Sequence, residues 1–118
     1  MIVIENGIVR KACLRDYLDA VKMLLQLIPA GKVVSYGELA RLLGVPPVFV
    51  GKLLAMNDEA PIVPCHRVVR SNGELGGYSG PGGIRFKRKL LEVEGVRIDA
   101  EGRVSRDSFV HFTELLDP

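Results

Sequence analysis

The chain has 118 residues, about the size of one domain, and 47% of them are hydrophobic, which is enough to form a buried core. Sixteen Lys and Arg residues against fourteen Asp and Glu residues give a formal net charge of +2. An excess this small allows nucleic acid as a partner but does not indicate it, because the distribution of charge matters more than its sum.

The cysteine content and the N-terminal residues exclude several classes of protein. Cys13 and Cys65 are far apart and form no C-x-x-C pair, which argues against a disulfide framework and for a reducing compartment. The start, M-I-V-I-E-N-G, lacks the basic segment of a signal peptide. No apolar run approaches the roughly 20 residues that span a bilayer. We expect a soluble, intracellular, single-domain protein.

The N-terminal quarter predicts a hairpin and then a helix. Residues 1–9 alternate β-branched side chains around an Asn6-Gly7 pair, which is typical of a short hairpin or an edge strand. Pro29 and Gly31 are expected to end the helix that follows. Around residues 14–28, one helix face is marked by apolar residues three or four positions apart, namely Leu18, Val21, Leu25 and Ile28.

Two short helices are predicted next. Ser35 with Glu38 three residues later forms a capping box that starts a helix at Tyr36, and Gly44 lies just past its end. After the turn at residues 45–47, residues 48–56 read as a second helix whose buried positions are Val50, Leu53 and Leu54. This layout is that of a helix-turn-helix, although most such pairs in small proteins are ordinary packing.

The last third contains a glycine-rich loop and a basic helix. The loop, residues 71–83, has the composition of a lid or binding loop because glycine allows close backbone approach. Residues 84–95 predict a helix, and a small hairpin with a turn at residues 100–102 follows. The tail packs back as a strand or a helix. The first part of the predicted helix carries four basic residues, Arg85, Lys87, Arg88 and Lys89.

Cys65 and His66 stand side by side in P-C-H-R-V-V, and this pair suggests chemistry. Nearby cations lower the pKa of a thiol, and a neighbouring histidine can act as a base. Side chains adjacent on a strand point to opposite faces, so His66 would need an irregular backbone or a bridging water. Pro64 fits such a bend. The alternative is a buried structural cysteine beside a surface histidine.

The longer pattern decides between these alternatives. S-Y-G-E-L-A, then P-C-H-R-V-V, the glycine-rich loop and L-L-E-V-E-G follow one another in an order that resembles the O6-alkylguanine-DNA alkyltransferase family, the methylated-DNA–protein-cysteine methyltransferases. The resemblance extends from about residue 14 to residue 98.

This resemblance implies an α/β fold, a winged helix-turn-helix-like catalytic domain that is mostly helical with a few short strands. Residues 1–118 would form this single domain, with the helix-turn-helix at about 36–56, the active-site segment at 64–69 and the binding loop at 71–83. We expect the N-terminal domain that many members carry to be absent.

The resemblance also implies a reaction and the residues that perform it. Cys65 would be the nucleophile that takes the alkyl group from O6 of guanine in DNA, and His66 would be its base, acting through a water. Glu94 would orient His66, and the Tyr36 hydroxyl would help to neutralise the departing guanine. The thioether product is stable, so the protein would be a single-turnover, suicide methyltransferase. No cofactor and no metal are expected, because Cys13 and His111 lack a metal-ligand spacing.

Other residues would bind the substrate or support the site. The backbone carbonyl of Val68 would accept from the exocyclic amine of guanine, and Tyr78 and Ser79 would close over the flipped base. Asn57 would hold the turn between the second helix and the active-site strand. Arg67 would be structural and would anchor the glycine-rich loop through hydrogen bonds.

The chain departs from the family pattern in the second helix. Members usually have R-A-V-G, whose arginine enters the duplex, whereas residues 48–51 here read V-F-V-G. Val48, Phe49 and Lys52 are the expected DNA contacts. Phe49 could act as an apolar wedge or could simply pack in the core. Arg41, Arg70 and the basic residues at 85–89 would add phosphate contacts if they share this face, the alternative being a solvated helix face.

Three functions therefore compete. The first is DNA repair by alkyl transfer to Cys65, and the second is an alkyltransferase-like protein that recognises alkylated DNA without efficient transfer. A winged-helix regulator would leave Cys65, His66 and the loop without a purpose. The expected partner is double-stranded DNA that contains O6-alkylguanine, with no membrane, a monomeric state and a cytoplasmic location associated with the nucleoid.

Overall fold

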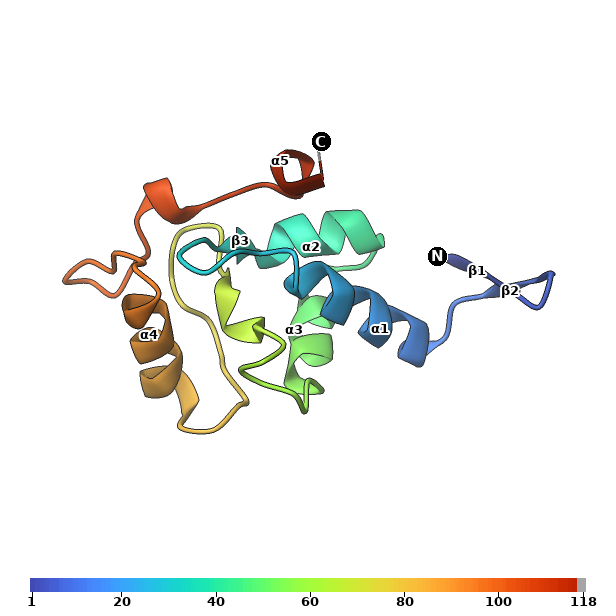
Figure 1. The fold of residues 1–118 in the computed structure, drawn as a ribbon, viewed down its shortest axis with the longest axis horizontal. Helices are drawn as coiled ribbons and strands as arrows, with labels where there is room; N and C mark the ends of the chain where they lie inside the picture. The colour runs from blue at the N-terminus through green and yellow to red at the C-terminus, as the bar shows by residue number, and fades with distance from the viewer. Residues whose placement is uncertain (117–118) are drawn as a thin grey trace.

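The computed structural model describes residues 1–116 and has an elongated shape in which helices surround a small parallel strand pair (Figure 1). The helices are α1 (Leu14–Leu25), α2 (Tyr36–Leu43), α3 (Pro47–Ala55), α4 (Gly83–Val93) and α5 (Phe112–Leu116). The strands are β1 (Ile2–Glu5), β2 (Ile8–Lys11), β3 (Val34–Ser35) and β4 (Val68–Val69), and 3₁₀ turns span Cys65–Arg67 and Arg106–Ser108. The mostly helical α/β fold that the sequence predicts is confirmed.

Of the two structures expected for the N-terminus, a short hairpin or an edge strand, the hairpin forms, and it extends away from the body of the molecule (Figure 1). Strands β1 and β2 pair antiparallel, with Ile4 opposite Val9. Asn6 at the turn has a φ of 53°, a left-handed conformation that asparagine tolerates better than most residues do. The guanidinium of Arg10 donates to Asp16 at 2.7 Å and ties the hairpin to α1.

Helices α1, α2 and α3 enclose the larger part of the core. The predicted apolar face of α1 is largely buried, although the helix ends at Leu25 and not near Ile28. The reason is local, because the amides of Leu27 and Ile28 bond to carbonyls three residues earlier, and Pro29 follows. The side chains of Ile28 and Leu25 remain fully buried.

Helix α2 begins and ends where its capping residues predict. The Ser35 hydroxyl accepts from the Glu38 amide at 3.1 Å, and Gly44 closes the helix with a left-handed φ of 69°. Among the described contacts, the other half of the expected capping box, a bond from the Ser35 amide to the Glu38 carboxylate, does not form. The Glu38 carboxylate instead accepts from the amide of Phe112 and from the ring of His111, both at 3.0 Å. Glu38 therefore holds the C-terminal segment, which forms α5.

Strands β3 and β4 connect two distant parts of the chain. They pair in parallel, with Val34 opposite Val68 and Ser35 opposite Val69. Both valines of β4 are fully buried. Because α2 begins directly after β3, this pairing places the first residues of α2 beside the Pro64–Val69 segment.

Helix α4 and the segment after it complete the fold. Lys87 is fully buried, so the interpretation of residues 85–89 as one solvated or DNA-facing cluster is wrong for this residue. The expected hairpin after Val96 is reduced to one bridge between Ile98 and Val104. Within residues 1–116, no helix has the length and apolar character needed to span a membrane.

Candidate active site

The backbone around Cys65 is irregular, as Pro64 suggested. The Cys65 amide donates to the Val63 carbonyl at 2.9 Å, which makes a tight bend at Pro64, and residues 65–67 form a 3₁₀ turn. In a regular strand, successive side chains point to opposite faces. Because residues 65–67 form a 3₁₀ turn, the side chains of Cys65 and His66 are not constrained in this way. Both residues are buried, with 5% of Cys65 and 1% of His66 exposed.

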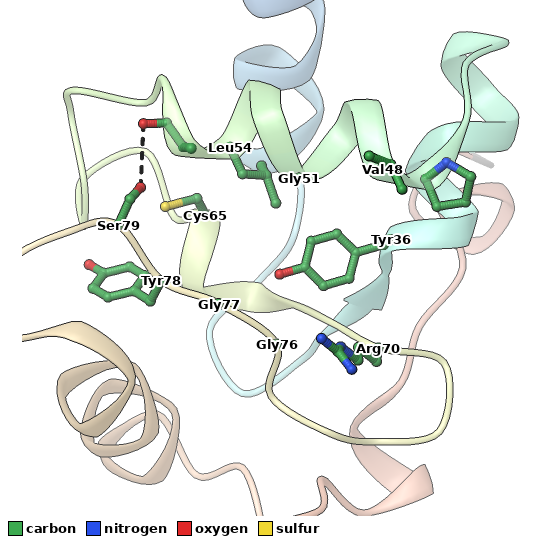
Figure 2. A pocket seen from close by; sticks show the side chains of 12 residues that line it. Tyr36, Val48, Gly51, Leu54, Cys65, Arg70, Gly76, Gly77, Tyr78 and Ser79 are labelled. Carbon is green, nitrogen blue, oxygen red and sulfur yellow. Dashed lines mark hydrogen bonds between the residues drawn. The ribbon is translucent and has the colours of Figure 1, made fainter.

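Cys65 lines a cavity of about 570 Å³, which lies between α3, the start of α2 and the glycine-rich loop (Figure 2). Tyr36 and Tyr78 form two of its walls, and Ser79 and Val48 lie on its lining as well. The remaining lining residues are Pro47, Gly51, Leu54, Ala55, Arg70, Gly76 and Gly77. Across residues 1–116, no three His, Cys, Asp or Glu side chains lie together in a position to hold a metal ion.

His66, Glu94 and Arg67 form a hydrogen-bonded network behind Cys65. The Nε2 atom of His66 lies 3.0 Å from Glu94 Oε2, and the Arg67 guanidinium donates to both Glu94 oxygens at 3.0 and 2.7 Å. Burial would raise the pKa of Glu94, but the hydrogen bonds from Arg67 and His66 outweigh it and lower that pKa. Glu94 is therefore a carboxylate, and it fixes the histidine proton on Nε2.

The other ring nitrogen of His66 is available as a base. Nδ1 is buried and has no hydrogen-bond partner among residues 1–116. Burial lowers the pKa of His66 below its usual 6.5, against the opposing effect of Glu94, so the ring is neutral at pH 7. A buried, unpaired nitrogen on the residue that follows Cys65 is of the type that can accept a thiol proton, directly or through one water.

Tyr36 contacts the glycine-rich loop closely. A Cβ at Gly76 would lie 2.7 Å from the Tyr36 hydroxyl oxygen, and Gly76 has a φ of 73°, so this position requires glycine. Burial raises the pKa of Tyr36, so its hydroxyl keeps its proton at neutral pH. Tyr36 can therefore act as a proton donor inside the cavity.

Lys87 holds the glycine-rich loop in place, a role that the sequence interpretation missed. Its ammonium group donates to the carbonyls of Val68 at 2.8 Å, Gly77 at 3.1 Å and Leu75. Burial lowers its pKa to about 8, which leaves it largely charged at pH 7. Its position one helical turn before buried Leu91 was the available signal, because residues four apart share a helix face.

Two neighbouring residues make contacts that were not expected. The Val68 carbonyl, expected to bind guanine, accepts from Lys87, and Val68 is absent from the cavity lining. Arg67, expected to anchor the glycine-rich loop, instead bonds Glu94 and the Ile28 carbonyl at 2.6 Å. Lys87 is the side chain that ties the loop to β4.

The three expected DNA contacts on α3 occupy different environments. Val48 lines the cavity mouth with 73% of its surface exposed. Phe49 packs edge-on against Tyr17 at a ring-centroid distance of 5.7 Å, so of its two interpretations the packing one describes the structure. Lys52 is exposed but does not line the cavity. On the opposite side, the Ser79 hydroxyl donates to the Ala55 carbonyl of α3 at 3.4 Å (Figure 2).

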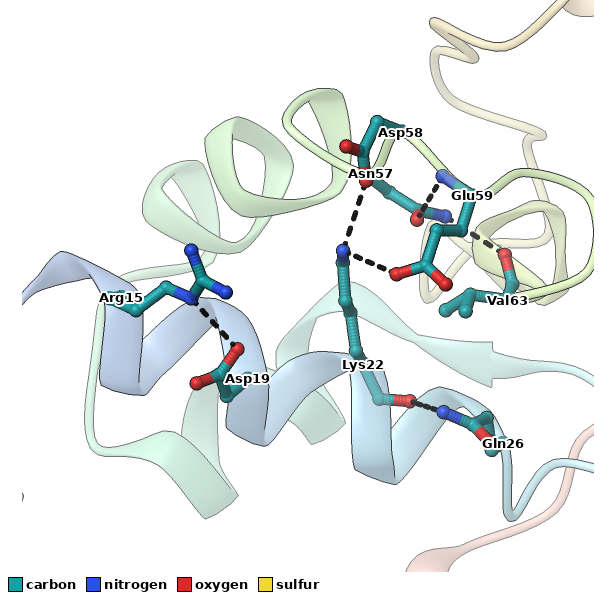
Figure 3. A network of polar contacts seen from close by, with 8 residues as sticks. All are labelled: Arg15, Asp19, Lys22, Gln26, Asn57, Asp58, Glu59 and Val63. Atoms are coloured by element: carbon teal, nitrogen blue, oxygen red, sulfur yellow. Dashed lines mark hydrogen bonds and ion pairs between the residues drawn. The ribbon is translucent and has the colours of Figure 1, made fainter.

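Asn57 supports the segment that leads to Cys65. Its side-chain amide donates to the Val63 carbonyl at 2.9 Å, and its oxygen accepts from the Glu59 amide at 3.1 Å. Lys22 of α1 donates to Asp58 and Glu59 beside it, at 3.1 and 2.8 Å (Figure 3). The turn after α3 is therefore held by Asn57 within the turn and by Lys22 from α1.

Comparisons with known proteins agree with this geometry. Residues 16–96 match the family described as "6-O-methylguanine DNA methyltransferase, DNA binding domain". The methylated-DNA–protein-cysteine methyltransferase of Saccharolobus solfataricus is 51% identical over 71 residues, which are 60% of this chain and 45% of that protein. Its counterpart in Methanothermobacter thermautotrophicus is 37% identical over 86 residues, 73% of this chain and 48% of that one. The chain thus spans about half the length of the curated relatives it matches.

Solved structures give the same result. The Mycobacterium tuberculosis OGT in complex with DNA superposes with a TM-score of 0.62 and 44% identity, covering 72% of this chain and 51% of that one. The S. pombe Atl1 in complex with damaged DNA containing O6-carboxymethylguanine superposes with a TM-score of 0.69 and 27% identity, covering 84% and 98%. The fold, the Pro64–Val69 segment and these matches together assign the chain to the 6-O-methylguanine DNA methyltransferase family.

Proposed function

We propose that this protein repairs DNA by direct reversal, transferring an alkyl group from O6 of guanine irreversibly to Cys65. The observation that carries the proposal is the buried pair of His66 and Glu94 beside Cys65, with Nδ1 of His66 left unpaired. A structural cysteine would not need a neutral, oriented histidine next to it. The names of the relatives support the same reaction.

The chemistry follows from the protonation states of these groups. His66 Nδ1 takes the proton from the Cys65 thiol, and Glu94 stabilises the imidazolium that results. The thiolate attacks the alkyl carbon, a carbon–sulfur bond forms, and the carbon–oxygen bond breaks with its electron pair left on guanine. Tyr36 passes its hydroxyl proton to the departing base, which leaves as neutral guanine, and the proton that His66 took from the thiol returns through water to the Tyr36 oxygen. A thioether is stable, and none of the described side chains that line the cavity can hydrolyse it, so each molecule reacts once.

The proposed partner is double-stranded DNA containing O6-alkylguanine, bound by a monomer. The reacting atom lies inside the duplex, so the nucleotide must rotate out of the base stack into the cavity. A volume of about 570 Å³ is in the range of small-molecule sites, and the exposed Val48 at its mouth is suitably placed to contact the opened duplex. Tyr78 and Ser79 of the glycine-rich loop would then enclose the base.

A second candidate is lesion recognition without efficient transfer. The observation that favours it is the similarity to Atl1, which was solved in complex with damaged DNA containing O6-carboxymethylguanine and of which the match covers 98%. The presence of Cys65 in the cavity, with His66 and Glu94 behind it, favours transfer.

Intact mass after incubation with a duplex that contains O6-methylguanine separates the two candidates. We expect the wild type to gain one methyl group in place of a proton, Cys65→Ala to gain none, and Cys13→Ser, which removes the exposed cysteine, to behave as the wild type. No gain with the lesion duplex still bound would establish the recognition protein. No gain and no binding would refute both candidates.

A further inference from the structure

Arg70 is the charged side chain of the cavity that the proposed reaction leaves without a role. Among the described residues that line the cavity it is the single one with a permanent charge, and none of the others is acidic. A cavity with one cation and no carboxylate favours an anionic ligand.

The backbone of Arg70 is held firmly at the cavity wall. The residue directly follows β4, whose valines are fully buried. Its amide donates to the Glu74 carbonyl at 2.8 Å, and its carbonyl accepts from the Gly73 amide at 2.9 Å. The position from which the side chain extends is therefore fixed before any ligand binds.

The guanidinium group, in contrast, has no strong partner in the part of the chain that the structure describes. The side chain is 62% exposed, and Glu74 Oε2 lies 3.8 Å from its Nη1 atom, beyond hydrogen-bond distance. The other oxygen of Glu74 accepts from the Asn72 amide at 2.7 Å. The five N–H groups of Arg70 remain available to a ligand.

Arg70 faces the cavity from the side on which Tyr36 lies (Figure 2). Its positive charge opposes the rise in the pKa of Tyr36, which is consistent with a guanidinium close to the tyrosine hydroxyl. Solvent screens a group this exposed from the reacting atoms, so its charge acts best on a ligand group at the rim.

We propose that Arg70 binds a backbone phosphate of the nucleotide that enters the cavity. The inference rests on the proposed function. The base is neutral and occupies the interior, whereas the phosphates on either side of it stay at the rim, where the planar guanidinium can donate two hydrogen bonds to phosphate oxygens. The contact would form when the nucleotide is rotated out, and it would not form with an intact duplex.

The test measures affinity as a function of salt in the Cys65→Ala background, where no transfer occurs. Each phosphate contact contributes roughly 0.9 to the slope of log K against log salt concentration on duplex DNA. We expect Arg70→Gln to reduce that slope by about 1 for a duplex containing O6-methylguanine and to leave it unchanged for the undamaged duplex. Arg70→Lys should keep the slope. The matched control is Arg15→Gln, which removes an exposed arginine that also has an acidic neighbour four residues away and lies outside the cavity.

Three results would overturn the inference. The slope for the lesion duplex could be the same in Arg70→Gln as in the parent protein. It could fall equally for both duplexes, which would make Arg70 an ordinary phosphate contact. In protein that retains Cys65, Arg70→Gln could lower the transfer rate at saturating DNA while the slope measured in the Cys65→Ala background stays constant, which would mean that Arg70 acts on the reacting atoms. If wild-type protein neither gains a methyl group nor prefers the lesion duplex, the proposed function fails and this inference fails with it. A methyl gain with any of the three results rejects the role of Arg70 alone.

Discussion

Replacing Glu94 by Gln tests the hydrogen-bonded network behind Cys65. The substitution keeps the size of the side chain but turns one acceptor oxygen into a donor, and three donors from Arg67 and His66 converge on those oxygens. At least one donor would then face another donor, and the Arg67 charge would lose its counter-ion. Removing one partner of a buried ion pair lowers the free energy of unfolding by about 3–5 kcal/mol. Because both side chains of this pair are slightly exposed, we expect a loss of about 3 kcal/mol.

Urea unfolding at pH 7 measures this loss. The entropy of unfolding is proportional to chain length. For a chain of this length, a loss of about 3 kcal/mol lowers the melting temperature by about 12 °C. The matched control is Glu92→Gln, since Glu92 is 3.7 Å from Arg88 in an exposed pair and should change stability by less than about 0.5 kcal/mol. Transfer should also slow by about 100-fold or more, because the orientation of the base His66 is lost.

A double-mutant cycle with Arg67→Met separates the ion pair from other effects. The double variant has neither charge, so its free energy of unfolding should exceed the additive value by about 2 kcal/mol. A Glu94→Gln protein within 0.5 kcal/mol of the wild type, or strict additivity in the cycle, would show that the network contributes little, contrary to this reasoning.

Three further predictions concern single groups. Asn57→Ala should lower the free energy of unfolding by about 2 kcal/mol in urea titration, because it leaves the buried Val63 carbonyl without its donor, and a loss below 0.5 kcal/mol would contradict this. Gly76→Ala should displace Tyr36 and slow alkyl transfer strongly in a single-turnover assay, whereas Gly77→Ala, with nothing within 4 Å of its new Cβ, should react normally. His66 has a lowered pKa in the folded state, so the unfolded chain binds more protons just below pH 6.5, and stability should fall as the pH drops from 6.5 towards the folded pKa. This slope should disappear in His66→Gln, and a flat profile in the wild type would argue against a buried neutral ring.

Local signals predicted several elements of the fold, because those elements depend on residues close in sequence. Ser35 and Gly44 set the ends of α2 through capping geometry, and Asn6-Gly7 set the hairpin turn. The irregular bend at Pro64 followed from the covalent restriction of proline. These predictions needed no knowledge of the tertiary structure.

Long-range partners could not be predicted in the same way. Glu38 fits a capping box by spacing, yet its carboxylate bonds Phe112 and His111 more than 70 positions later. Lys87 lies among three other basic residues and resembles them in composition, but three backbone carbonyls surround its ammonium group. Which polar group a long side chain reaches depends on how distant segments pack, and a local sequence pattern does not predict that packing.

The parallel pairing of β3 with β4 has a consequence for the order of folding. Val34 and Val68 are separated by more than thirty residues, so closing this contact costs chain entropy before any nearby packing compensates for it. The thiol of Cys65 acquires its environment when this loop closes, because β4 directly follows the 3₁₀ turn that carries it. The reactivity of Cys65 towards an alkyl donor during refolding should therefore appear late, together with native tertiary structure, and would report on the final step of assembly.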